Sequence, residues 1–451
     1  MTIDDFNEAR ERMRDARKGI VKPSIYFKNQ FTGRPFSLNQ KMHFGMGTYM
    51  CMTGPPGTGK TAFIDTEFLL NPILDHMNNP QQYADIYCIY RSMERSSVDK
   101  MAKWICYLIY LGTEGKVLMD EATFFQHHSK KRLLTDHDLA LVDALEDYIK
   151  EISKSIDLVT DTDSPEGIKQ YLTKTLYRMG SYITTDLDKI YRNGEIMKTK
   201  ILENDVPIDK KFDMIDEQGR PYTILRFPST GKEVKVSPGF SRFYPKKKDQ
   251  IIMTINDTVD VIKILPKKNE TDTTAEHADN MRQFRKDGAL AIIDIKQFGK
   301  ESEKDFKSSS NHSLTVNQAD IKGSHSIAQN ADICLSILDP ARYNITQWGG
   351  HPNGDWEGYN LERFHETFRL LQIFKNSGNG NLYKMPCIFI GEIGFFNQIP
   401  EPRYINETDY QEINRKFLSH LNPPEETKQK ELFDNNKFKI KKGGEDTEAP
   451  F

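Results

Sequence analysis

Residues 54–63, GPPGTGKTAF, decide the fold of this chain. They fit the pattern G-x-x-x-x-G-K-[ST], a loop whose backbone cradles phosphate groups. A short apolar run, TYMCM (48–52), precedes the loop, and IDTEFLL (64–70) follows it. A simple Gly/Pro-rich turn is disfavoured, because both glycines, the Lys-Thr pair and the strand-then-helix context occur together. The segment therefore predicts a binding site for a nucleoside triphosphate.

The residues of this P-loop have separate roles. Backbone N–H groups of the glycine-rich segment, together with the positive end of the following helix, face the polyphosphate. We expect Lys60 to reach the β- and γ-phosphates and the Thr61 hydroxyl to hold Mg²⁺. The predicted nucleotide-binding residues are Gly54, Pro55, Pro56, Gly57, Thr58, Gly59, Lys60, Thr61 and Ala62.

Composition limits the possible classes of protein. The 451 residues are enough for roughly two to three domains. With 62 Lys+Arg against 65 Asp+Glu, the net charge is −3, so nucleic acid would have to bind to local basic loops. The five cysteines form no C-x-x-C pair, which argues against a zinc site or a disulfide framework. Without a signal peptide or a run of about 18 apolar residues, we expect a cytoplasmic protein that makes no membrane contact.

The order of patterns along the chain predicts an α/β fold. The P-loop strand, a helix from about residue 60 and a strand at 84–92 form the start of a βαβ unit, and hence of a mostly parallel sheet flanked by helices. Residues 136–156 and 167–183 have helical spacing, whereas 213–237 alternate as a hairpin does. Two further strands are expected at 249–257 and 288–298.

These patterns give a predicted domain organisation. Residues 1–20 form an amphipathic, linker-like helix, and 21–184 form the first part of the ATPase core. Residues 185–247 form an inserted α+β subdomain, and 248–423 complete the core. The charged tail, 424–451, is poor in apolar residues and is expected to be disordered.

Four further segments, in order, carry a family resemblance. They are RSMERSSVDKMAKWI (91–105), IIMTIND (251–257), DIKQFGKESEK (294–304) and NQADIKGSHSIAQNADICLSIL (317–338). With the P-loop, they resemble the RecA-like ATPase domain of DnaB-type replicative helicases, the hexameric ring motors of bacteria and their phages. The resemblance covers about 40–115 and 248–400.

The resemblance implies an ATP-dependent helicase that translocates on single-stranded DNA in replication as a homohexamer, with ATP and Mg²⁺ bound, and with a primase or a helicase loader as a possible partner. It implies that Glu94, in SMER, is the catalytic glutamate and that Gln297 senses the γ-phosphate or DNA. Glu94 lies just beyond a strand, at the edge where ligands of parallel sheets bind. An exposed glutamate near a helix start is the alternative interpretation.

Two aspartates compete as the carboxylate that holds Mg²⁺. Asp257 closes IIMTIND, whereas Asp294 closes the more apolar run ALAIID (289–294). We assign Asp257 because the strand ending near Gln297 leads directly to the segment 320–332, which in the family follows the glutamine-bearing strand. If Asp294 were the metal residue, the order of motifs would shift by one strand.

A long polar loop after Gln297 is the predicted DNA-binding element. It carries Lys300, Lys304, Lys307 and Lys322. In the family, the corresponding loops face the central channel and grip DNA phosphates, so a ring could present a basic pore despite the net charge of the chain. A solvated loop is the alternative for any one of these lysines.

Two departures from the family pattern leave questions open. The family supplies a lysine and an arginine to the γ-phosphate of the neighbouring subunit. Here Lys375 matches the lysine, but Ser377 stands at the arginine position. Either Lys375 acts alone, or a residue such as Arg369 substitutes, or hydrolysis is weak. In addition, only about 40 residues precede the P-loop strand, in place of the family's collar domain.

A recombination or regulatory DNA-binding ATPase of the RecA superfamily is therefore the alternative function.

Overall fold

The computed structural model of the protein describes residue 10 and residues 24–125, 134–185, 200–299 and 314–418, apart from 209, 211, 216–220, 227–232, 323–324, 352, 379 and 381. The predicted tail, all but residue 10 of the predicted first helix, and Lys300, Lys304 and Lys307 lie outside the described residues. No helix in the described part of the chain is long and apolar enough to cross a membrane.

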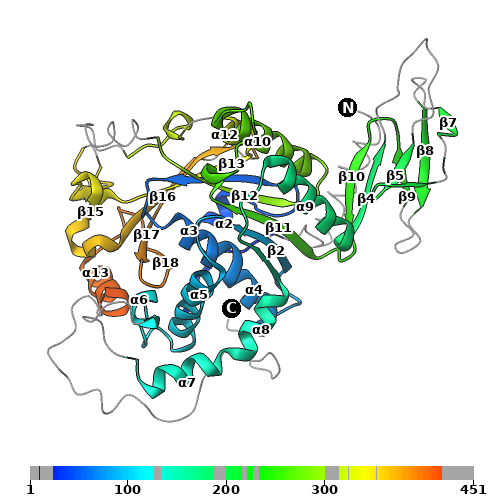
Figure 1. Cartoon of the computed structure of the whole chain (residues 1–451). Coiled ribbons are helices and arrows are strands. Elements are labelled where there is room, and N and C mark those ends of the chain that lie inside the picture. The colour runs from blue at the N-terminus through cyan, green and yellow to red at the C-terminus, as the bar shows by residue number, and fades with distance from the viewer. Residues whose placement is uncertain are drawn as a thin grey trace.

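A nine-stranded sheet forms the centre of the molecule (Figure 1). Its strand order is β18-β17-β16-β13-β1-β12-β11-β2-β3. All pairings from β13 to β3 are parallel, and the three remaining strands add to the β13 edge in antiparallel fashion. This confirms the predicted α/β class with a mostly parallel sheet. The strands are β1 (Tyr49–Gly54), β2 (Asp85–Ser92), β3 (Ile156–Val159), β11 (Gln250–Asp257), β12 (Ala291–Gln297), β13 (Ile333–Leu338), β16 (Phe368–Asn376), β17 (Tyr383–Ile390) and β18 (Phe395–Gln398).

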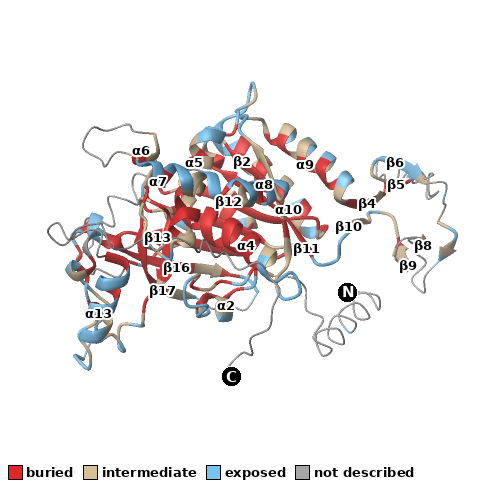
Figure 2. Cartoon of the chain, turned by 90° about the horizontal axis from the view of Figure 1, so that it is seen from below, coloured by how far each residue is buried: buried red, intermediate tan, exposed pale blue. Residues whose placement is uncertain are grey.

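Helices cover both faces of this sheet, because successive side chains of a strand point to opposite faces. On β1, Met50 and Met52 join one hydrophobic cluster, whereas Tyr49 and Cys51 join the other. The first cluster includes α3 (Lys60–Phe63), the π-helical η1 (Ile64–Leu70), α4 (Asn71–Asn78) and α5 (Ser97–Gly112). The second includes α9 (Pro165–Met179), α10 (Glu270–Lys286) and α12 (Ser326–Asn330). Figure 2 shows that burial is concentrated in these layers.

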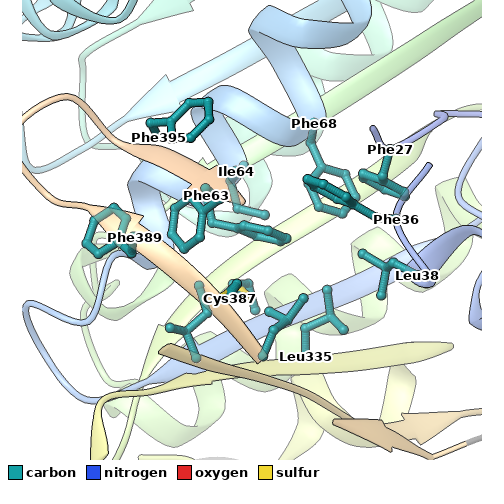
Figure 3. Packing of buried hydrophobic residues seen from close by; sticks show 14 of the residues in the cluster. Phe27, Phe36, Leu38, Phe63, Ile64, Phe68, Leu335, Cys387, Phe389 and Phe395 are labelled. Carbon is teal, nitrogen blue, oxygen red and sulfur yellow. The ribbon is translucent and has the colours of Figure 1, made fainter. Parts of the chain in front are cut away.

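The helix that continues from the P-loop is anchored by aromatic packing. The ring of Phe68 lies 4.9 Å from that of Phe27, 5.2 Å from that of Phe44 and 5.9 Å from that of Phe63, measured between centroids. All four side chains are buried. Figure 3 shows Phe27, Phe63 and Phe68 among other apolar side chains of this cluster. This packing fixes the position of the helix relative to the sheet.

The region before β11 forms separate, smaller sheets that lie to one side of the main sheet in both whole-chain views (Figures 1 and 2). One sheet has the order β10-β4-β5-β6, and β7-β8-β9 form another. The predicted hairpin at 213–237 corresponds to β7, β8 and β9. The division into domains stays a prediction. These strands are β4 (Gly180–Thr185), β5 (Ile201–Glu203), β6 (Val206–Ile208), β7 (Met214–Ile215), β8 (Pro221–Arg226), β9 (Glu233–Val236) and β10 (Ser241–Pro245).

Two predicted helical stretches end earlier than their sequence patterns. The stretch 136–156 forms α7 and α8, but Ile156 opens β3, a strand that the sequence analysis did not place. The stretch 167–183 forms α9 only to Met179. At Gly180 the chain enters β4 beside β10, and a Cβ atom there would lie 2.3 Å from the Tyr244 carbonyl oxygen. Tertiary strand pairing therefore overrides the local helical pattern.

The remaining elements are short segments around this core. They are α2 (Leu38–Lys41), α6 (Glu121–Phe124), α7 (Asp136–Ala144), α8 (Glu146–Lys154), α13 (Glu407–Ile413), β14 (Gln347–Trp348), β15 (Tyr359–Asn360), η2 (Val259–Val261), η3 (Gln318–Asp320), η4 (Pro340–Tyr343), η5 (Leu361–Thr367) and η6 (Asn414–Leu418).

Replacing Phe68 with Ala should lower the free energy of unfolding by about 3–5 kcal/mol, because it leaves a cavity among buried rings. Val98→Ala on α5 is the control. Val98 is 63% exposed, and its substitution should change stability by no more than about 0.5 kcal/mol. Chemical denaturation of both variants measures the difference, and equal losses would contradict the packing described for Phe68.

Candidate nucleotide-binding site

The P-loop begins at the carboxyl end of β1 and is closely surrounded by the sheet. Gly54 has φ +146° and Gly59 has φ +101°. A Cβ atom on Gly54 would lie 2.5 Å from the Ile337 carbonyl oxygen, and one on Gly59 would lie 2.7 Å from the Phe389 ring. Both positions therefore require glycine for backbone angle and for space. The predicted loop residues, 54–62, lie together here.

Lys60 lies inside the loop. Its ammonium group donates hydrogen bonds to the carbonyl oxygens of Gly54 (2.9 Å) and Pro55 (2.8 Å), and the residue is 8% exposed. Burial lowers the pKa of Lys60 to about 8, although the carboxylates of Asp257, Asp260 and Glu94 oppose this shift. An incoming phosphate would offset the burial by adding negative charge beside the ammonium group.

Thr61 and Asp257 are brought together from positions far apart in the sequence. The Thr61 hydroxyl donates a hydrogen bond to Asp257 Oδ1 over 2.9 Å. A hydroxyl and a carboxylate oxygen are ligands that suit Mg²⁺ when phosphate oxygens complete its coordination. The two residues therefore fit the predicted metal site. No group of three or more His, Cys, Asp or Glu residues in the described ranges is placed to hold a metal by itself.

Asp294, the rival carboxylate, faces the opposite side of the sheet from α3. It is fully buried and accepts hydrogen bonds from Tyr49 (2.6 Å) and Asn256 (2.7 Å), and His277 lies 3.0 Å away on α10. Burial raises the pKa of Asp294, but His277 and these hydrogen bonds outweigh it and bring the pKa below its usual value. These contacts favour a structural role for Asp294 and support Asp257 as the metal carboxylate.

Glu94 lies beyond the end of β2, at the same edge as the P-loop. It is exposed, yet partial burial raises its pKa, and the negative charges of Asp257 and Asp260 raise it further. A carboxylate with a raised pKa is a better proton acceptor, as a general base requires. The position and the electrostatics are consistent with the predicted catalytic role, which stays a prediction.

Gln297 ends the strand next to β1, where its backbone is in register with Gly54. Its N–H donates to Asp260 Oδ2 over 2.9 Å. Asp260 also lies 3.3 Å from Lys296 and 3.9 Å from Lys322. The sequence analysis missed Asp260, which joins the end of β12 to the electrostatic surroundings of the site. The contacts of Lys322 with acidic side chains partly neutralise its charge, and its DNA-binding role stays a prediction.

Arg369, the proposed substitute for the missing arginine, is buried behind its own P-loop. Its Nε donates to the Thr58 carbonyl oxygen over 3.2 Å, and Nη2 lies 3.3 Å from Asp339. Arg369 is only 7% exposed, so it cannot reach the phosphate of a neighbouring subunit. That alternative was wrong: Arg369 supports the P-loop from within the same chain.

Lys375 lies at the opposite end of the sheet from the P-loop. It is in register with Cys334 near the start of β13, which is level with the start of β1. Its ammonium group donates to the carbonyl oxygens of Ala328 (2.7 Å) and Gln329 (2.9 Å). At about 3.3 Å per residue, the length of β1 separates Lys375 from its own P-loop. The lysine can therefore serve only the site of another copy.

Comparison with solved structures agrees with this arrangement. The ATPase domain of a DnaB-like helicase matches with a TM-score of 0.53 at 12% identity, over 88% of this chain and 99% of the other. The chain has the RecA-like ATPase fold. At this identity the match establishes the fold alone.

Two further structures match with lower scores. A DnaB-like replicative helicase, solved to study its interactions with primase, has a TM-score of 0.45 at 12% identity, over 79% of this chain and 60% of the other. The RadB recombinase has a TM-score of 0.35 at 9% identity, over 79% of this chain and 93% of the other. Neither carries weight here. No protein-family model and no curated protein matches the sequence.

The pKa of Lys60 predicts a pH dependence of nucleotide binding. Below pH 8 the lysine is charged, whereas above it the free site loses the proton that a bound phosphate would retain. The affinity for a fluorescent ADP analogue without Mg²⁺ should therefore fall about tenfold between pH 7 and pH 9. Lys60→Arg, which stays charged, should lose this slope, and a pH-independent affinity of the unaltered protein would contradict the assignment.

Substitutions should also separate the two aspartates. Asp294→Asn should lower the free energy of unfolding by about 1–3 kcal/mol, because it removes a buried charge partner, and should leave the Mg²⁺ dependence of nucleotide binding intact. Asp257→Asn should remove most of that Mg²⁺ dependence. Thermal unfolding and nucleotide titrations measure both effects. The reverse pattern would make Asp294 the metal carboxylate.

Proposed function

We propose that the protein is an ATP-hydrolysing motor that translocates on single-stranded DNA as a ring of six copies, in the manner of DnaB-type helicases. The observation that carries the proposal is the hydrogen bond between Thr61 and Asp257 at the edge of a RecA-like sheet. With Lys60 inside the loop and Glu94 beside it, this edge has the groups that nucleotide hydrolysis requires.

Each residue has a role in this chemistry. The backbone of the P-loop binds the phosphates and Lys60 neutralises part of their charge. Glu94 orients a water molecule and accepts its proton as the water attacks the γ-phosphate. Thr61 and Asp257 hold Mg²⁺, which when bound offsets the charge that develops on the phosphate oxygens. Gln297, in register with Gly54, is placed to report the state of the γ-phosphate to the loop that follows it.

The position of Lys375 supports action between subunits. It lies at the far edge of the sheet from its own P-loop, so a second copy must supply the site that it serves. A ring meets this need, because every subunit then donates one lysine and receives another. With Ser377 at the arginine position and Arg369 buried, Lys375 is the cation that we assign to this role.

DNA binding rests on the loop between β12 and β13. This segment leaves β12 at the edge that carries the P-loop, so the state of the nucleotide could move it. We assign the DNA phosphates to Lys300, Lys304 and Lys307, with Lys322 at the base of the loop. A ring of six copies would concentrate these charges around its channel. A primase or a loader remains a possible partner in this proposal.

A complementation experiment tests the central claim. Lys375→Ala has an intact P-loop but offers no lysine, whereas Lys60→Ala offers the lysine but has a defective P-loop. Each should lower kcat about 10²–10³-fold. When the two variants are co-expressed, about one interface in four unites an intact P-loop with an intact lysine, so the activity should recover to about a quarter of the unaltered level.

The same preparation gives the controls. The unaltered protein should assemble as a hexamer whose ATP hydrolysis rises with single-stranded DNA. Lys384→Ala, on the neighbouring strand β17, should retain activity by itself. Absence of recovery in the mixed preparation would show that Lys375 does not act between subunits. A filament or a monomer without DNA stimulation would instead favour a recombination or regulatory ATPase.

A further inference from the structure

A buried lysine lies directly behind the carboxylate assigned to Mg²⁺. The ammonium group of Lys100 lies 3.0 Å from Asp65 Oδ2 and 3.1 Å from Asp257 Oδ2. The side chain of Lys100 is 1% exposed, and those of Asp65 and Asp257 are 4% and 5% exposed. One cation therefore stands between two carboxylates in a site that solvent does not reach.

Two aromatic side chains complete this buried cluster. The Tyr90 hydroxyl lies 2.7 Å from Asp65 Oδ1 and 3.0 Å from Asp257 Oδ2. The Trp104 indole N–H donates to Asp65 Oδ2 over 3.2 Å. Charged groups are buried at such sites only when they are paired and hydrogen-bonded, and each charge here meets that condition.

The cluster divides the two oxygens of Asp257. Oδ2 is held by Lys100 and Tyr90, whereas Oδ1 accepts the hydrogen bond from Thr61. The carboxylate cannot rotate without breaking contacts on both sides. Its free direction is thus fixed toward the P-loop threonine, the other residue assigned to the metal.

Electrostatics explain why the lysine is needed. Asp65 and Asp257 are both buried, and their charges repel each other at low dielectric. Lys100 offsets this repulsion and holds the Oδ2 atom of Asp257 on its own side. Without the ammonium group, Asp257 would turn away from Asp65, and the alignment of Oδ1 with Thr61 would be lost.

The cluster also joins three parts of the site. Lys100 lies in the first turns of α5, which begins three residues after Glu94, and Asp65 lies in η1, which continues the P-loop helix. Asp257 ends β11, and its carbonyl oxygen accepts a hydrogen bond from the Met93 N–H over 2.7 Å. The metal carboxylate is therefore tied both to the P-loop helix and to the segment that carries Glu94.

We propose that Lys100, charge-balanced by Asp65, is a positioning residue that keeps Asp257 Oδ1 directed at Thr61 and so sets the affinity of the site for Mg²⁺. The proposal rests on the proposed nucleotide-binding function, and it adds to the P-loop motif a buried pair that acts through Asp257. The Lys100 side chain does not touch the nucleotide or the metal itself.

The experiment measures the Mg²⁺ concentration that gives half-maximal binding of a fluorescent, non-hydrolysable ATP analogue. Lys100→Met should raise this concentration at least about tenfold, as removal of a residue that orients a metal ligand does. Binding of the analogue without Mg²⁺ should be unchanged. Lys103→Met, on the same helix, is the matched control and should leave the Mg²⁺ dependence unchanged, because Lys103 contacts only the carbonyl oxygens of Gly391 and Glu392.

A second variant separates positioning from folding. Lys100→Met alone leaves two buried carboxylates without a cation and is expected to lower the Tm. The double variant Asp65→Asn/Lys100→Met removes one charge of each sign, so its Tm should return toward that of the unaltered protein. The positioning role requires that its Mg²⁺ requirement stay raised. A double variant with both the Tm and the Mg²⁺ requirement restored would overturn the proposal.

The outcomes also separate this inference from the proposed function. If the unaltered protein does not bind the analogue, the proposed function itself fails. If it binds the analogue with Mg²⁺ dependence and the double variant binds with the same dependence, only the role of Lys100 fails.

Discussion

The parallel pairing of β1 with β12 on one side and β13 on the other is the constraint on which the rest of the structure depends. It fixes the carboxyl end of β1 between two neighbours, and the P-loop that leaves this end is confined so tightly that Gly54 and Gly59 have no room for a side chain. The same pairing brings Gln297 level with Gly54. The site is therefore a product of strand register, and its glycines are a consequence of that register.

Opposite faces of the sheet divide the charged residues by function. Asp257 and Lys100 lie on the side of the P-loop helix, whereas Asp294 pairs with His277 under α10. The alternation of a strand makes this division, because neighbouring positions point to opposite faces. Two buried aspartates that look equivalent in the sequence thus have different surroundings, one polar and open to the nucleotide edge, the other closed.

Opposite ends of the sheet divide the site in a second way. Arg369 and Lys375 both belong to β16, six residues apart, which corresponds to about 20 Å of strand. The first supports the P-loop of its own chain through the Thr58 carbonyl oxygen. The second lies at the far end, beside α12. One strand therefore runs from the nucleotide edge of its own subunit to the edge that we assign to the neighbouring site.

The sequence by itself determined the class of fold, the P-loop and the order of the main strands, because these depend on local patterns: glycines with a Lys-Thr pair, and apolar runs of strand length. It also placed Glu94, Gln297 and Asp257 at strand ends. Only the tertiary structure decided which aspartate faces Thr61, that Arg369 is buried, and that Lys100 joins Asp65 to Asp257. These facts depend on which side chains meet across the sheet, and residues 35 to 157 positions apart meet there for reasons of packing that no local pattern records. The one signal in the sequence was a charged residue at a core-facing position of a helix, and this signal does not name its partner.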